Sequence, residues 1–505
     1  MSKTYRPWTP LQPYLLPPSP TEWLPKNHLV YFVLEVVSQL DLSAIELAIA
    51  AKDPRGERPY APRMMVALLI YGYCIGVFSS RRLARATYED VAFRVLASES
   101  HPHFTTINDF RLAHGDALGS LFVQGLRLCE RAGLVQLGHV SLDGAKLLAN
   151  ASKHKAMSYK RMQDEEARLR AEVDALLRRA AEVDREEDAL FGVGRDPWDL
   201  PEELSHREGR LARIQAAKAE LEREAADERA RQLRDQEQSL KAKAADPAVS
   251  PNKRKEAATL AAKRAQQALT LDSADKKPSD DDEPPAASAG DLPRHRPSTT
   301  SDGKPAPKAQ RNFTDPDSRI MQKSGTFIQA YNAQIAVDGE HQIIVAHAVT
   351  NQSPDTEHLP PMMKRIKEAT GRYPERLTAD SGYYSNANVE HCEELAVDPY
   401  ICVGRTKHDG TLTLNPTASP GPTRDRMVAK MTSHRGRAVY SRRKVIVEPV
   451  FGQIQQARGF RRFSMRGLLK SRWEFGLVCF GHNLLKLFRS ARSGSSANAL
   501  AAGYA

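Results

Sequence analysis

The spacing of apolar side chains divides the chain into parts with different periodicity. From residue 28 to 136 apolar positions recur every three to four residues with few strand signals, which predicts an all-helical unit. Further along, short apolar runs alternate with helical stretches. We expect strands at 138–148, 326–338, 342–349, 376–379 and 400–404, and helices at 358–369, 386–396 and over most of 445–487. The pattern predicts an α+β or mixed α/β sheet preceded by a helical unit.

A long charged segment interrupts this pattern from about residue 159. Apolar residues recur there in alternating steps of four and three, as in a coiled coil, at Leu169, Val173, Leu176, Ala180 and Val183. The pattern breaks at 191–197, where Gly and Pro gather, and resumes with Leu204, Leu211, Ile214 and Leu221. We therefore expect a helical coiled-coil insertion over 159–271, built as an antiparallel hairpin or as an arm that forms dimers.

Two segments hold too few large apolar side chains to form a core. Residues 272–311 are rich in Asp, Ser, Pro and Lys, so burial cannot offset the entropy lost on ordering. We predict a disordered linker there and a flexible tail at 491–505.

The charge balance indicates an anionic partner. The net charge is +11 and the isoelectric point is near 9.3, which favours nucleic acid over an acidic membrane surface. The five cysteines show no CxxC pairing, which argues against a zinc site or a disulfide framework. The longest apolar run, 64–78, is shorter than the roughly 18 residues that span a bilayer. We expect a soluble protein of the cytoplasm.

Two helical segments in the first unit have a pattern that fits DNA docking. Residues 79–86 carry several arginines and are followed by a second helix start at 103–111. A helix, a polar turn that carries arginines and a second helix are together compatible with a helix-turn-helix DNA-binding motif. An ordinary helical bundle with a solvated basic face explains the same pattern.

Three acidic residues stand in three separate apolar stretches: Asp143 in Ser-Leu-Asp-Gly, Asp380 in Ala-Asp-Ser-Gly, and Glu448 in Val-Ile-Val-Glu-Pro-Val. Either aspartate alone could be a turn residue or a helix cap. Glu448 lies among apolar residues, so burial would require a partner, either a metal ion or one of the preceding basic residues. Carboxylates that converge from distant segments are what a pair of divalent metals needs for phosphoryl chemistry.

The carboxyl-terminal region is strongly basic. From residue 430 to 492 the only acids are Glu448 and Glu474. The stretch 459–467 interleaves arginines with Phe460 and Phe463, and these charges would bind phosphates without sequence preference. Alternatively, the two rings lie in the core and the arginines point outward, which is equally compatible with DNA binding.

At these motifs the chain resembles the DDE transposases of bacterial insertion sequences. The resemblance covers the three acids in their order, the segments 314–319 and 329–334, and the amino-terminal helical unit. It implies a ribonuclease H-like catalytic core over 137–158 and 312–490, and a helical DNA-binding domain over 1–136. It further implies that Asp143, Asp380 and Glu448 are catalytic and hold two Mg²⁺ (or Mn²⁺) ions.

A signature of the family places Tyr, Arg, Glu and Lys around the third acid. Tyr440 and Glu448 match it, whereas Lys444 stands where Arg is usual unless Arg443 serves with a shift of one residue. Gln455 stands at the Lys position, and Arg458 or Arg461 would then replace that lysine. The residues expected at the DNA are Tyr440, Arg443, Lys444, Gln455, Arg458, Arg461, Arg462 and Arg466.

The resemblance implies a DNA transposase. It would bind terminal inverted repeats, cleave there and transfer the strand ends to target DNA, acting as a homodimer in a bacterial cytoplasm, near the nucleoid, with no membrane partner. Two alternatives remain at this point: a DNA-binding or scaffolding protein without catalysis, and a metal-dependent nuclease that does not join strands.

Overall fold

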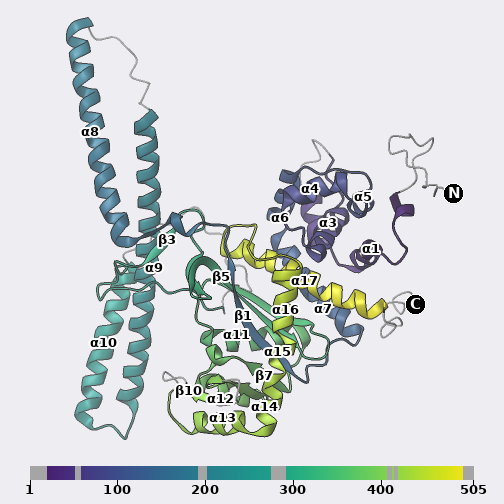
Figure 1. The fold of residues 1–505 in the computed structure, drawn as a ribbon. Coiled ribbons are helices and arrows are strands. Elements are labelled where there is room, and N and C mark those ends of the chain that lie inside the picture. The colour runs from purple at the N-terminus through teal and green to yellow at the C-terminus, as the bar shows by residue number, and fades with distance from the viewer. Residues whose placement is uncertain are drawn as a thin grey trace, which may run out of the picture.

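The computed structural model describes residues 20–51, 58–191, 202–273, 292–406, 412–414 and 419–492. A mixed sheet with its helices forms the centre, a helical unit lies beside it, and a long helical arm projects from the opposite side (Figure 1). The predicted tail falls almost wholly outside the described residues, as does the part of the linker from 274 to 291.

The amino-terminal unit consists of helices, as predicted. After the short η1 (Pro20–Trp23) they are α1 (Leu29–Gln39), α2 (Ser43–Ala50), α3 (Pro62–Ile75), α4 (Ser80–Glu89), α5 (Val91–Ala97), α6 (Phe104–Ala113) and α7 (Gly115–Arg131). Helix α3 begins with proline and ends at Gly76, whose φ of 86° suits a left-handed cap. Nearly all of α3 between these ends is buried, so it forms the core of the unit.

The central sheet has six strands. They are β1 (Val140–Leu148), β4 (Arg319–Lys323), β5 (Thr326–Asp338), β6 (Ile344–Thr350), β7 (Arg376–Ala379) and β8 (Asp398–Ile401). Their order is β4-β5-β1-β7-β8, and β6 also pairs with β5. Strand β1 is antiparallel to β5 and parallel to β7. Strand β1 therefore lies in the middle of the sheet, between β5 and β7, and Asp380 follows directly after β7.

The remaining elements connect and cover this sheet. They are η3 (Thr356–His358), α11 (Leu359–Thr370), η4 (Ser381–Tyr383), α12 (Asn386–Glu394), β9 (Gly404–Thr406), β10 (Leu412–Leu414), α13 (Pro422–Thr432), α14 (His434–Ser441), α15 (Arg443–Ile446), α16 (Glu448–Gly452), the π-helical η5 (Gln453–Ala457) and α17 (Leu468–Arg492). Short strands β9 and β10 pair with each other, apart from the main sheet.

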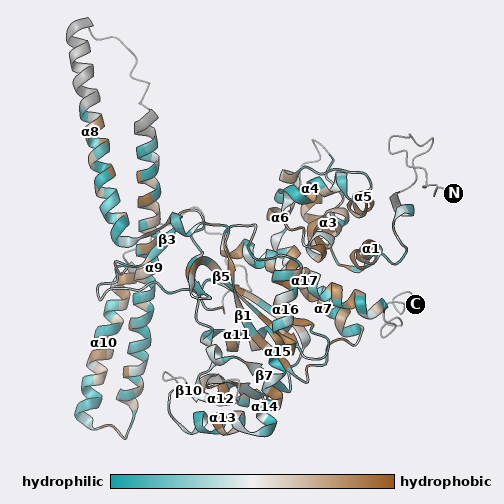
Figure 2. Ribbon diagram, viewed as in Figure 1, coloured by the Kyte–Doolittle hydropathy of each residue, from teal (hydrophilic) through white to brown (hydrophobic). Residues whose placement is uncertain are grey.

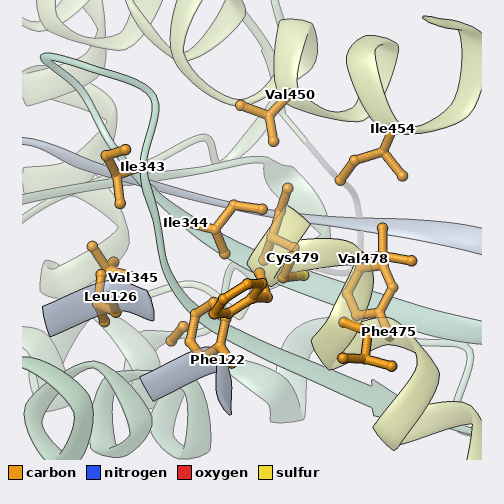
Figure 3. Close-up of a cluster of buried hydrophobic side chains, with 14 of the residues drawn as sticks. Phe122, Leu126, Ile343, Ile344, Val345, Val450, Ile454, Phe475, Val478 and Cys479 are labelled. Atoms are coloured by element: carbon orange, nitrogen blue, oxygen red, sulfur yellow. The ribbon is translucent and has the colours of Figure 1, made fainter. Parts of the chain in front are cut away.

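Helix α17 joins the amino-terminal unit to the sheet. It packs against α7 and α3 on the one hand and against β6 on the other. Figure 3 shows side chains from α7, β6 and α17, such as Phe122, Ile344 and Phe475, meeting in one apolar cluster. A single hydrophobic core thus runs from the helical unit into the sheet, from Val30 to Leu487.

The arm is inserted between β1 and β4 and consists of three helices, α8 (Tyr159–Phe191), α9 (Glu202–Ala245) and α10 (Pro251–Ser273). The first half of α9 pairs with α8 and the second half pairs with α10, so two helix pairs extend in opposite directions (Figure 1). Leu169 of α8 and Ile214 of α9 are buried in one small apolar cluster. Much of the remaining surface of the arm is hydrophilic (Figure 2). The sequence reasoning did not foresee that α10 is a partner of α9.

The base of the arm is fixed to the sheet domain. Strand β2 (Ala156–Ser158) before the arm pairs with β3 (Gln310–Asn312) after it. In addition, Glu224 in the middle of α9 forms ion pairs with Arg311 at 2.7 Å and with Arg319 at 3.2 Å. Both arginines are buried, so the midpoint of α9 is anchored.

The linker prediction is wrong for residues 292–311. This segment lies against the sheet domain: the His295 amide donates to Asn351 at 2.8 Å, and Leu292 is buried. Main-chain hydrogen bonds and the β2–β3 pairing order it, and these do not depend on the large apolar residues that the composition lacked. The predicted strand bounds, by contrast, are confirmed at 326–338 and at 376–379.

Within the described residues, no helix taken singly has both the length and the apolar character to cross a membrane. The helices Pro62–Ile75 and Ser80–Glu89 meet that test only as a pair, with a 97° bend between them.

Candidate active site

Asp143 and Asp380 are held side by side by two paired strands. Leu142 in β1 is the register partner of Ala379 in β7, and the two strands run parallel. Each aspartate follows its partner residue directly, so both stand at the same level of neighbouring strands, which lie roughly 4.8 Å apart. The sheet thus brings together two acids that are separated by more than two hundred residues of sequence.

The two aspartates share a buried, negatively charged environment. Burial raises the pKa of Asp143 to about 6; Arg443 opposes this rise, and the charges of Asp380 and Asp355 add to it. The pKa of Asp380 is also raised, by burial first and then by Asp355. Carboxylates crowded in this way favour a proton or a cation between them.

Glu448 reaches this pair through an arginine. It is the first residue of α16 and its side chain is 49% exposed. Arg443 donates to Asp143 Oδ2 at 3.0 Å and to Glu448 Oε1 at 3.3 Å. Arg443 therefore lies between the first and the third acid. Lys444, the alternative for the signature position, is exposed.

A fourth carboxylate lies at the site, and sequence reasoning did not single it out. Asp355, in the loop between β6 and η3, accepts hydrogen bonds from Lys146 at 3.1 Å, from Asn332 at 2.7 Å and from Gln334 at 2.8 Å. Its charge raises the pKa of both Asp143 and Asp380. In sequence it stands in a short polar loop, where nothing separates it from an ordinary turn residue.

The basic residues expected at the DNA occupy two kinds of position. Arg461, Arg462 and Arg466 are exposed, while the neighbouring Phe460 and Phe463 are buried in the core. This agrees with the interpretation in which the rings point inward and the arginines outward. Main-chain hydrogen bonds to Leu148 at the end of β1 hold this segment beside the sheet.

Two further members of that set, Tyr440 and Arg458, have defined partners. The ring of Tyr440 is half-buried beneath the guanidinium of Arg443, 6.0 Å from its centroid. Arg458 is buried and donates to the carbonyls of Tyr73 and Val478. Arg458 thus joins η5 to the helical unit and to α17, whereas Arg461 is exposed.

Lys323 on β4 is a second residue that sequence reasoning missed. Its ammonium lies 3.5 Å from Gln455 Oε1 and 2.8 Å from the carbonyl of Lys146. Burial and the neighbouring Arg461 lower the pKa of this lysine. A half-buried ammonium next to another cation is suited to binding an anion. Lys323 also lies beside Gln455, which stands at the position where the family signature has a lysine.

Helices α4 and α6 contain the two segments whose sequence pattern fits DNA docking, and only part of their basic charge is exposed to solvent. Arg81, Arg82 and Arg85 on α4 are exposed. Arg111 on α6, in contrast, is buried and pairs with Glu474 of α17 at 3.3 Å. That arginine holds the helical unit to α17, so α4 carries the exposed basic charge of this segment.

The acids suit a hard divalent cation by their chemistry, because all their donor atoms are carboxylate oxygens. Among the described residues, no group of three or more His, Cys, Asp and Glu side chains is already arranged to hold a metal ion. The crowding of Asp143, Asp380 and Asp355 nevertheless fits a cation. Arg443 lies between Asp143 and Glu448. For Glu448 to bind the same cation, Arg443 would therefore have to move aside and the glutamate would have to move toward Asp143.

Two family models match the chain. The model described as Transposase DDE domain matches residues 297–484, and the model described as Transposase domain (DUF772) matches residues 18–112. The chain belongs to the DDE-type transposases of insertion sequences. A search of curated proteins and a search of solved structures found no match.

Membership explains several features of the structure. The DDE domain implies a ribonuclease H-like core, here a mixed sheet with β1 at its centre. Transposase domains imply DNA as the partner and a nuclease or transposase activity, and the family generally depends on divalent metal ions. The matched DDE segment contains Asp380 and Glu448, whereas Asp143 precedes it and the arm.

Proposed function

We propose that this transposase binds the terminal inverted repeats of its own insertion sequence, cleaves the DNA there and transfers the strand ends to target DNA. The observation that carries the proposal is the adjacency of Asp143, within β1, and Asp380, directly after the paired strand β7, with Arg443 joining Glu448 to Asp143. Acids that converge from three segments are what phosphoryl transfer requires.

Asp143 and Asp380 would hold two Mg²⁺ (or Mn²⁺) ions, and Glu448 would complete the shell of one of them. Bound there, the ions supply Lewis-acid activation of the attacking oxygen and stabilisation of the leaving oxygen. Arg443 lies next to the same acids, so its guanidinium is placed to bind the phosphodiester that is cut. Both aspartates are partly buried, which limits their contact with water and strengthens these interactions.

The DNA would lie along the end of β1. Arg461, Arg462 and Arg466 are exposed there, and Lys323 lies beside Gln455. These side chains would bind backbone phosphates, with Lys444 and Tyr440 nearer the acids. Because Arg458 is buried among main-chain carbonyls, we assign it a structural role instead.

The helical unit would recognise the inverted repeats, with α4 supplying exposed arginines. We further propose that the protein acts as a homodimer on DNA, in which the arm contributes to the contact between copies. Its place of action would be the bacterial cytoplasm, at the nucleoid.

The test compares Asp143→Asn, Asp380→Asn and Glu448→Gln with the wild-type protein on a DNA fragment that carries the element end. Each substitution should abolish Mg²⁺-dependent cleavage and leave DNA binding intact. Asp425→Asn, at an exposed carboxylate on α13, is the control and should cleave normally. Full cleavage activity in Asp143→Asn would contradict the proposal that Asp143 is one of the catalytic acids.

Two other functions predict different outcomes. A scaffolding protein without catalysis would bind element ends but cut none under any metal condition. A nuclease that does not join strands would cut, but would yield no joined product from pre-cut ends and a target plasmid. Pre-cut ends therefore separate the transposase from both alternatives, and cleavage of uncut element ends separates the nuclease from the scaffolding protein.

A further inference from the structure

Asp355 touches the backbone next to both catalytic aspartates. A Cβ atom added to Gly144, the residue after Asp143, would lie 3.1 Å from Asp355 Oδ1. A Cβ added to Gly382, two residues after Asp380, would lie 3.5 Å from Asp355 Oδ2. One carboxylate thus packs against two glycines from different elements, Gly144 of β1 and Gly382 of η4. The absence of side chains at 144 and 382 allows this close approach.

The same carboxylate connects the elements that carry the aspartates. Lys146 lies on β1, three residues after Asp143, and Gln334 lies on β5. The Gln334 amide donates to Asp355 and its oxygen accepts a hydrogen bond from Tyr383, within η4 just after Asp380. Next to Asp355, Thr356 donates to the carbonyl of Gly382 at 2.9 Å. Asp355 is therefore the common partner of β1, β5 and η4.

The hydrogen bonds of Asp355 argue against direct metal binding by this residue. A carboxylate has about four lone-pair sites. Oδ1 accepts from Lys146, Asn332 and Gln334, and Oδ2 accepts from Lys146 at 3.2 Å. The ammonium of Lys146 also balances its charge. The side chain is thus occupied by protein donors, as expected for a residue that orients its neighbours.

We propose that Asp355, held by Lys146, is a positioning residue that sets the separation of Asp143 and Asp380, and thereby the affinity of the site for divalent cations. The inference rests on the proposed function only in taking those two aspartates as the residues that hold metal. Groups that orient metal ligands in this way change metal affinity by about 10- to 100-fold when they are replaced.

The test measures Mn²⁺ binding to the full chain by titration calorimetry, without DNA, so that no cleavage contributes to the readout. Asp355→Asn and Lys146→Met should each raise the dissociation constant of Mn²⁺ about 10- to 100-fold. Lys146→Arg keeps the charge and should stay close to wild type. Glu357→Gln, at an exposed carboxylate two residues further along, is the matched control and should bind Mn²⁺ normally.

Two further measurements complete the experiment: the melting temperatures of the Asp355 and Lys146 variants, and Mn²⁺ binding by Asp143→Asn. If Asp355→Asn and Lys146→Met lower the melting temperature but leave Mn²⁺ affinity unchanged, the role is merely structural and the inference fails. Tighter Mn²⁺ binding by Lys146→Met would mean that Asp355 is itself a ligand, which also overturns it. If Asp143→Asn binds Mn²⁺ as wild type does, the proposed metal site fails; if only Asp355→Asn does, this inference alone fails.

Discussion

The guanidinium of Arg443 lies 3.0 Å from Asp143 Oδ2, although three hundred residues separate the two along the chain. The same guanidinium reaches Glu448. The first and third acids of the site are therefore joined through one cation, and that cation is Arg443 rather than Lys444.

Replacing this cation should impair the proposed reaction. Arg443→Ala removes the charge that offsets the crowding around Asp143 and the group placed to bind the phosphodiester. We expect a loss of about 10²-fold in the cleavage rate, the scale seen when one preorganised donor is removed. Arg442→Ala, which removes an exposed pair with Glu340, is the control. Equal losses in both variants, measured in a single-turnover cleavage assay, would contradict the role of Arg443.

Two glycines should respond in opposite ways to alanine. In Gly144→Ala the new Cβ would lie 2.4 Å from Gln334 Nε2, so the Asp355 network must shift. We expect a loss of about 1–3 kcal/mol in the free energy of unfolding. Gly452 in α16 has no neighbour within 4 Å of an added Cβ, and alanine there should stabilise by about 0.5–1 kcal/mol. Urea denaturation measures both, and a neutral Gly144→Ala would show that the network yields easily.

The ion pair between Arg111 and Glu474 should be important for stability. Both side chains are almost fully buried, and Glu474 also accepts from the Ser464 amide at 2.9 Å. Glu474→Gln leaves Arg111 as a buried, uncompensated charge, which typically costs about 3–5 kcal/mol. Glu46→Gln breaks an exposed pair with Arg63 and should leave the melting temperature nearly unchanged. Similar melting curves for both variants would refute this account.

Buried histidines should make the protein less stable in acid. Burial lowers the pKa of His482 to about 3, below its ordinary value of 6.5. Between these values the unfolded chain binds a proton that the folded chain does not, so stability falls as pH falls from 6.5 toward 3. The contribution of one such group approaches about 1.4 kcal/mol per pH unit.

His482→Gln should therefore flatten the dependence of unfolding free energy on pH between 6 and 4, because glutamine can still donate to the Gln342 carbonyl. The control is His434→Gln at an exposed position on α14. Denaturant titrations at several pH values provide the measurement. An unchanged slope in the His482 variant would mean that this histidine is protonated in the folded protein.

The distal part of the arm should be removable without loss of the catalytic domain. Ser158 and Gln310 are register partners at the base of the arm, and Glu224 pairs there with Arg311 and Arg319. A short turn in place of residues 176–206 would shorten the α8–α9 pair and keep these anchors. We expect a folded protein whose mass, measured by light scattering on DNA, falls from that of a dimer to that of a monomer. A dimer of the shortened chain would show that this part of the arm is not needed for association.

Much of this architecture could be predicted from local pattern. The period of apolar residues correctly indicated the amino-terminal helices and the strands 326–338 and 376–379. These features depend on neighbours in sequence, because helix and strand periodicity place every side chain relative to the next few. The motifs around the three acids also lie within short segments, so they were visible without a structure.

Contacts between distant segments were decided only by the tertiary structure. Asp355 and Lys323 carry no local signal; the loop after β6 brings Asp355 to Lys146 of β1, and β4 brings Lys323 to the carbonyl of the same residue. The choice of Arg443 over Lys444, and the burial of Arg458 and Arg111, likewise depend on which face of each helix meets the core. The sequence by itself determined the elements and the three acids; the packing of the chain determined which charges face those acids, because burial and pairing arise only when remote segments meet.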